Sequence, residues 1–247
     1  MSTLFRRAPL AVLCLALPAF AQQDRWQKSI DDGLHALATY AHAGAEQHFR
    51  TALDEAQGLG PLQVAQSSIY LGLVYERQDQ FDRADPLYAR ALALREKELG
   101  PDHPDVASAL EHCARIVRKL GQQTEADAAA TRARDIRERA IREKWRAETK
   151  PEASRVGGGT TAPRLLQRIE PEYCEEARVF RHDGVVELSI QVWPDGRAHN
   201  IDIRHGLGLG LDEKAAEAVS RWRFEPGTWD GRPITVGALV TVHFRLL

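Results

Sequence analysis

The chain has 247 residues, of which 43% are hydrophobic and 28% are charged, and its formal net charge is −2. This size and composition are enough to bury one or two ordinary hydrophobic cores. The near-neutral charge gives no electrostatic support for a nucleic-acid partner. No stretch approaches the roughly 20 apolar residues that a membrane-spanning helix needs.

The N-terminus has the pattern of an export signal. Arg6 and Arg7 precede an apolar run of about 13 residues that ends in the tripeptide at 19–21 (Ala-Phe-Ala). Small residues at the first and third positions of this tripeptide fit a signal-peptidase site, so we predict a signal peptide over residues 1–21. The alternative is an uncleaved anchor, which the shortness of the run disfavours.

Residues 22–148 are predicted to be helical and to contain repeats. A set of small and apolar positions recurs with a spacing of 42, first as Leu71, Gly72, Tyr75, Ala84, Tyr88 and Ala91, then as Cys113, Ala114, Ala126, Ala130 and Ala133. These positions resemble the packing positions of tetratricopeptide (TPR) repeats, and the connection at 99–106 resembles that of the kinesin-light-chain subtype. An earlier copy around Phe49 brings the expected number of helix pairs to about three, the usual minimum for a stable stack.

Two charged or flexible segments follow the repeats. Five arginines between 132 and 142 are interleaved with acidic residues, which favours a solvated outer face of a capping helix over a basic binding patch. Residues 149–162 contain Gly, Ser and Pro and are predicted to form a flexible linker. Even fully extended, such a linker reaches only about 45 Å.

The region from 163 to 247 is predicted to begin its fold with a β-hairpin. Apolar and polar residues alternate from Val186 to Val192, and again around Ile201 and Ile203. Between these two runs, Pro194-Asp-Gly196 has the turn chemistry of a hairpin.

A helix and a last strand are predicted after the hairpin. Alternating glycines at 206–210 precede a short amphipathic helix. The helical spacing of its apolar residues predicts that it runs to Arg223, and Pro226 ends it. The longest alternation in the sequence, from Ile234 to Leu246, predicts the last strand. The order strand, strand, helix, strand indicates a two-layer α+β domain with an antiparallel sheet, after an all-α helical-hairpin solenoid.

Ordered short motifs in this region resemble the C-terminal domain of the TonB family of energy transducers. They lie at 163–173, 176–178, 183–186, 194–197, 208–212, 221–226 and 230–233. The family usually has Pro where this chain has Cys174. The resemblance covers roughly a third of the chain. Within this domain we expect core anchors at Tyr173, Leu211, Trp222 and Phe224.

The same resemblance implies a binding site on the last strand, which in the TonB family pairs with the short TonB-box segment of outer-membrane transporters. An exposed edge strand presents unpaired N–H and C=O groups that an extended peptide can use. The corresponding residues are Thr235, Val236, Gly237, Ala238, Leu239, Val240 and Thr241. We expect Thr235, Gly237, Leu239 and Thr241 to face away from the core. The alternative is an edge covered by a neighbouring segment or a second copy.

No motif for catalysis or cofactor binding is found in the sequence. There is no HExxH, no Cys-x-x-Cys, no phosphate-binding loop and no Gly-x-Ser-x-Gly, so we expect no enzyme, no cofactor and no metal. After removal of a signal peptide, Cys113 and Cys174 would remain, and they permit one disulfide without requiring it.

Two functions therefore compete. The first is a periplasmic adaptor of a Gram-negative bacterium, whose TonB-like domain binds an outer-membrane transporter while the TPR stack binds a second protein. The second is a membrane-anchored energy transducer that couples inner-membrane motor proteins, driven by the proton-motive force, to siderophore uptake. The predicted signal peptide and the lack of a long Pro-rich spacer favour the adaptor. We expect a monomer or weak dimer and no nucleic-acid partner.

Overall fold

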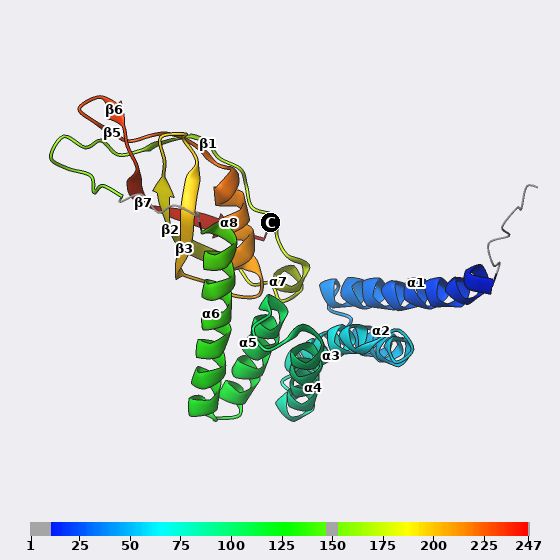
Figure 1. The fold of residues 1–247 in the computed structure, drawn as a ribbon. Helices are drawn as coiled ribbons and strands as arrows, with labels where there is room; N and C mark the ends of the chain where they lie inside the picture. The colour runs from blue at the N-terminus through cyan, green and yellow to red at the C-terminus, as the bar shows by residue number, and fades with distance from the viewer. Residues whose placement is uncertain (1–10, 147–152, 247) are drawn as a thin grey trace, which may run out of the picture. The chain divides into compact units, whose positions relative to one another are not determined.

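A computed structural model describes residues 11–146 and 153–246, and within these ranges eight helices and seven strands are present. The chain divides into two compact units, residues 1–98 and 99–247. Helical repeats followed by a small antiparallel α+β domain confirm the predicted fold class (Figure 1). The predicted signal peptide begins outside the described residues, and its described part starts α1 (Ala11–Ala38). No helix in the described ranges combines the length and apolarity that a bilayer crossing requires.

The first unit consists of α1 and three further helices, α2 (His42–Ala56), α3 (Pro61–Glu76) and α4 (Phe81–Leu99). Small side chains allow these helices to approach closely. A Cβ atom at Gly72 would lie 2.9 Å from the ring of Tyr88, so this position accepts only glycine without rearrangement. The structure buries all the expected packing positions of this unit, namely Leu71, Gly72, Tyr75, Ala84, Tyr88 and Ala91.

The second unit begins with a helical hairpin of α5 (Pro104–Lys119) and α6 (Gln123–Trp145). Pro104 occupies the first turn of α5, and the His103 side chain caps it by accepting a hydrogen bond from the Asp105 N–H. Of the expected packing positions here, Ala114, Ala126 and Ala133 are buried, whereas Cys113 and Ala130 are half-buried.

The central sheet of the second unit has three antiparallel strands in the order β3-β2-β7. They are β2 (Gly184–Val192), β3 (Ala198–His205) and β7 (Val236–Phe244). Gly196 takes a φ of +74° in the turn between β2 and β3, where the sequence predicts a hairpin. The middle of β7 pairs with β2 at Leu188 opposite Val240. The edge strands of this sheet are therefore β3 and β7.

Helix α8 (Leu211–Arg221) packs on the apolar face of this sheet. Its predicted extension to Arg223 is wrong, because Trp222 is already extended and residues Arg223–Glu225 form β4, paired with β1 (Arg164–Gln167). Burial of the Trp222 ring and its hydrogen bond to the Ile169 carbonyl redirect the chain. The remaining short elements are α7 (Glu175–Val179), β5 (Thr228–Trp229) and β6 (Arg232–Pro233).

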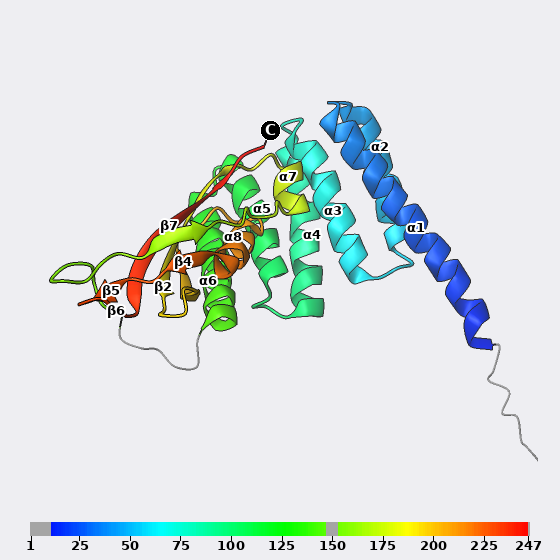
Figure 2. The same cartoon turned by 90° about the horizontal axis from the view of Figure 1, so that it is seen from above.

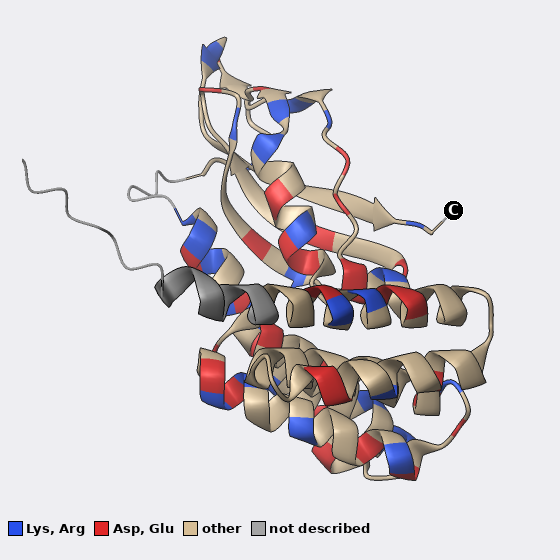
Figure 3. Ribbon diagram, turned by 90° about the vertical axis from the view of Figure 1, so that its right-hand side faces the viewer, with Lys and Arg blue, Asp and Glu red and all other residues tan. Residues whose placement is uncertain are grey.

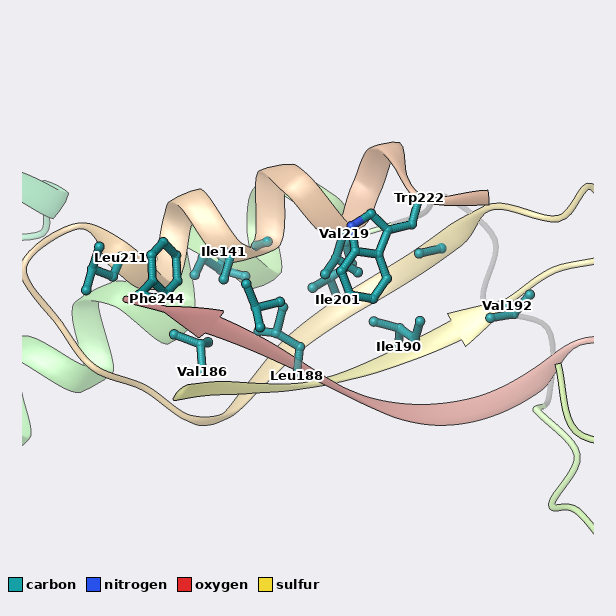
Figure 4. Packing of buried hydrophobic residues seen from close by; sticks show 14 of the residues in the cluster. Ile141, Val186, Leu188, Ile190, Val192, Ile201, Leu211, Val219, Trp222 and Phe244 are labelled. Carbon is teal, nitrogen blue, oxygen red and sulfur yellow. The ribbon is translucent and has the colours of Figure 1, made fainter. Parts of the chain in front are cut away.

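One hydrophobic core joins the sheet, α8 and α6. Figure 4 shows Ile141 of α6 near Phe244 and Leu188 in this cluster, and its side chain is fully buried. Of the expected anchors, Leu211, Trp222 and Phe224 are buried, while Tyr173 is half-buried and packs edge-on to Phe244 with ring centroids 5.5 Å apart. In the structure, α5 and α6 thus belong to the same compact unit as the sheet, whereas the 42-residue repeat in the sequence relates them to α3 and α4.

Candidate functional site

The outer edge of β7 is the candidate binding site. On its inner side β7 pairs with β2 along its whole length. Successive residues of a strand direct their backbone groups to opposite sides. Because the Gly237 N–H points outward, to the carbonyl of Ser154, the backbone groups of Leu239, Thr241 and His243 also point outward. No backbone hydrogen bond links these three residues to another segment within the described ranges, so they form a template for an added strand.

The side chains along β7 divide into two sets. Gly237, Leu239 and Thr241 are exposed, and the Leu239 residue is 75% exposed. Thr235 differs from the expected outward set, because it is only 8% exposed and precedes the strand. On the opposite face Val236, Val242 and Phe244 are buried, and Ala238 and Val240 are half-buried. An added strand would therefore meet the exposed Leu239 side chain on the open face of the sheet.

The opposite edge of the sheet, β3, lies against α6. The two elements pack side by side, and the Arg142 Nε atom donates to the Asp202 Oδ1 atom at 3.0 Å. Figure 2 shows the course of β7 from the β5–β6 hairpin to the C-terminus. The two edges are therefore not equivalent: α6 packs along β3, whereas the outward backbone groups of Leu239, Thr241 and His243 on β7 are unpaired within the described ranges.

A buried charged residue lies between the helical hairpin and α8. The Arg137 side chain is 2% exposed and donates to Glu111 Oε1 at 2.8 Å, to Glu213 Oε1 at 2.6 Å and to Ser108 Oγ at 2.8 Å. Burial alone would lower the pKa of this guanidinium, but the carboxylates of Glu111 and Glu213 reverse the effect and raise it. The charge is thus fixed, and it connects α5, α6 and α8.

The glycine-rich turn before α8 is held by carboxylates of the chain itself. Asp212 accepts hydrogen bonds from the Leu207 and Gly208 N–H groups at 2.7 and 3.1 Å, and Glu111 accepts one from Leu209 at 2.6 Å. Burial raises the pKa of Asp212 to about 6, against the opposing effects of Arg137 and the Leu207 N–H. These amides at the positive end of α8 are therefore already satisfied.

A second polar link connects α5 to α7. The buried His112 ring bonds Glu176 through Nε2, and Arg115 donates to its Nδ1 atom at 2.9 Å, which places the ring proton on Nε2. Nearby, the Cys174 thiol donates to the Leu209 carbonyl, and burial raises its pKa. Neither Cys174 nor Cys113 is part of a disulfide bond in the structure.

The sequence interpretation missed Arg137 because it lies among exposed arginines. Residues of both charge signs are interleaved along the helices (Figure 3), and Arg134 and Arg139 are exposed. The available signal was spacing: Ala133, Arg137 and Ile141 recur every four residues, and all three are buried on one face of α6. The expected solvated face of this helix therefore does not include Arg137.

Comparisons with known proteins match the two parts of the chain to two families. Residues 63–139 match the tetratricopeptide repeat, and residues 169–246 match the Gram-negative bacterial TonB protein C-terminal. These matches confirm both resemblances predicted from the sequence. Both families are generally non-enzymatic protein-interaction modules.

Curated relatives cover only the C-terminal region. Protein TonB of Klebsiella pneumoniae is 33% identical over 106 residues, which are 40% of this chain and 42% of that protein. Protein TonB of Escherichia coli K12 is 35% identical over 84 residues, which are 34% of this chain and 35% of that protein. The chain thus spans less than half the length of these relatives. Among solved structures, the TPR domain of Arabidopsis FLU covers 45% of this chain and 93% of that domain, with 20% identity and a TM-score of 0.42.

Proposed function

We propose that this chain, which joins TPR repeats to a TonB-like C-terminal domain, is a non-enzymatic periplasmic adaptor. Its β7 edge binds the TonB-box segment of a TonB-dependent outer-membrane transporter by strand addition. The observation that carries the proposal is the row of outward backbone groups from Leu239 to His243, on a strand already fixed by β2 on its inner side. From Leu239 onward, this preformed edge can accept an extended peptide without rearrangement.

Backbone pairing supplies the affinity in this mode of binding, and neighbouring side chains supply the specificity. Each outward residue offers one donor and one acceptor, and each net hydrogen bond contributes about 0.5–1.5 kcal/mol. On the open face of the sheet, the exposed Leu239 side chain would be the cross-strand neighbour of one side chain of the added strand. An apolar residue at that position of the peptide is therefore favoured.

The first unit is proposed to bind a second protein. A groove of about 550 Å³ lies between α2 and α4, over α3, and combines apolar with charged side chains. Its lining includes Leu53, Leu71, Tyr75, Pro86 and Leu87. Holding one partner here and a transporter at β7 would make the chain an adaptor. Coupling to a proton-motive-force motor is the alternative role.

Replacing Leu239 by proline tests the β7 site. The Leu239 N–H points outward, so the substitution removes a donor from the free edge and leaves the pairing of Ala238 and Val240 with β2 intact. We expect binding of a synthetic TonB-box peptide, measured by calorimetry on the full chain, to fall below detection. The circular dichroism spectrum and melting temperature should stay close to those of the parent.

The matched control is Leu239→Ala, which removes the exposed side chain but keeps the N–H group. It should weaken binding by less than about tenfold, because only the apolar contact is lost. A Leu239→Pro protein that remains folded and binds the peptide with parental affinity would contradict the proposed site.

A further inference from the structure

The start of the β7 edge is occupied by a segment of the chain itself. The Ser154 N–H donates to the Thr235 carbonyl at 3.0 Å, and the Gly237 N–H donates to the Ser154 carbonyl at 3.4 Å. Together these bonds form an isolated parallel bridge between Ser154 and Val236. Part of the region predicted to be a flexible linker therefore lies on the strand edge that an incoming peptide would use.

The same segment is fixed at its other end. The Thr161 N–H donates to the Thr228 carbonyl at 2.8 Å, and the Thr228 N–H donates to Thr161 Oγ1, also at 2.8 Å. Between these two attachments the chain turns back through Gly157 and Gly158, both with positive φ, and leaves the β7 edge after a single bridged residue. Residues 153–161 thus form a strap, which is attached strongly to Thr228 through Thr161 and weakly to the β7 edge through Ser154.

The weak attachment has little to stabilise it. Ser154, Arg155 and Val156 are exposed, so release of this segment uncovers little apolar surface. Its residues Ala153 and Arg155 also line a groove of about 650 Å³ on the open face of the sheet, together with Gly237 and Leu239. The segment therefore lies at both the edge and the face that an added strand would approach.

We infer that residues 153–156 are a displaceable strand that competes with the partner peptide for the β7 edge. This inference rests on the proposed function of β7 as a peptide-binding edge. In the occupied state an incoming strand can pair only from Leu239 onward. Displacement of Ser154 adds the Thr235 carbonyl and the Gly237 N–H to the available edge. Because the attachment of Thr161 to Thr228 keeps the competing segment close to β7, this segment has a high effective concentration although it makes only two hydrogen bonds with β7.

The test is Ser154→Pro, which removes the N–H that donates to Thr235 and leaves the strand β7 unchanged. The matched control is Ser154→Ala, which keeps both backbone hydrogen bonds. Two measurements are made on the full chain: amide hydrogen exchange at Gly237 without peptide, and the affinity for a synthetic TonB-box peptide. In Ser154→Pro we expect faster exchange at Gly237 and about three- to tenfold tighter peptide binding, because the binding-competent state is populated more. Ser154→Ala should match the parent in both.

The outcomes separate this inference from the proposed function. Unchanged exchange at Gly237 in Ser154→Pro would overturn the pairing of the strap. Faster exchange with unchanged or weaker peptide binding would overturn the competition and leave the β7 site standing. If neither the parent nor Ser154→Pro binds the peptide, the proposed function fails and the competition fails with it, even where exchange shows that the strap pairs.

Discussion

Replacing Arg137 by alanine is expected to lower the free energy of unfolding of the second unit by about 3–5 kcal/mol. The substitution leaves the carboxylates of Glu111 and Glu213 near one another without the cation that bridges them. It also removes the Ser108 hydrogen bond inside a buried region. Urea unfolding followed by hydrogen exchange, read on peptides from 184–246, measures this unit separately from residues 61–98.

Arg134→Ala is the matched control on the same helix. Its side chain is 64% exposed and lies 4.0 Å from Glu138, so we expect a change within about 0.5 kcal/mol. A triple variant with Arg137→Met, Glu111→Gln and Glu213→Gln should recover part of the loss, because it removes the unpaired charges as well. Equal stability of the Arg137→Ala and Arg134→Ala proteins would show that the buried ion pairs do not hold the hairpin to α8.

The second large effect is expected at Trp222, where replacement by alanine should lower the free energy of unfolding of the second unit by about 3–5 kcal/mol. The ring is 2% exposed in the core between α8 and the sheet, and its Nε1 atom donates to the Ile169 carbonyl at 2.8 Å. Alanine removes both the packing and the hydrogen bond, and a unit of this size can lose its fold as a result. The measurement is again urea unfolding of the second unit.

Two further variants keep this prediction testable if Trp222→Ala does not fold. Trp222→Phe retains most of the apolar contact but leaves the Ile169 carbonyl without its donor, so we expect a loss of about 1–3 kcal/mol. Trp229→Ala is the control, since Trp229 is 54% exposed and should change stability by less than about 1 kcal/mol. A Trp222→Phe loss no larger than that of Trp229→Ala would contradict the assignment of Trp222 as an anchor.

The central elements of the fold were predictable because their patterns are local. Alternation identified β2, β3 and β7, and the Pro194-Asp-Gly196 turn identified the hairpin. The short strands β1 and β4 were not predicted, because each depends on pairing with a segment about 60 residues away and carries little pattern of its own. The prediction of where α8 ends was wrong for the same reason. The helix ends at Arg221 because a tertiary hydrogen bond of Trp222 overrides helical spacing.

The strand that forms the candidate site could be predicted from the sequence, but the segments that lie beside the sheet could not. The resemblance to the TonB C-terminal domain indicated residues 235–241, and the structure shows that the outward groups of Leu239, Thr241 and His243 are unpaired within the described ranges. Neither the strap at Ser154 nor α6 along β3 has a sequence signal, because both are contacts between distant segments. Glycine and serine in the segment 149–162 suggested flexibility, whereas its backbone bonds depend on β7 and β5 being in place.

Amide-resolved hydrogen exchange of the full chain, with and without a saturating TonB-box peptide, tests the β7 assignment most directly. The free chain should protect Ala238, Val240 and Val242, which pair with β2, and leave Leu239, Thr241 and His243 in fast exchange. Adding the peptide should slow exchange at these three outward amides by about tenfold or more, since each gains a backbone acceptor. Peptide binding that leaves all three amides in fast exchange would contradict strand addition at β7.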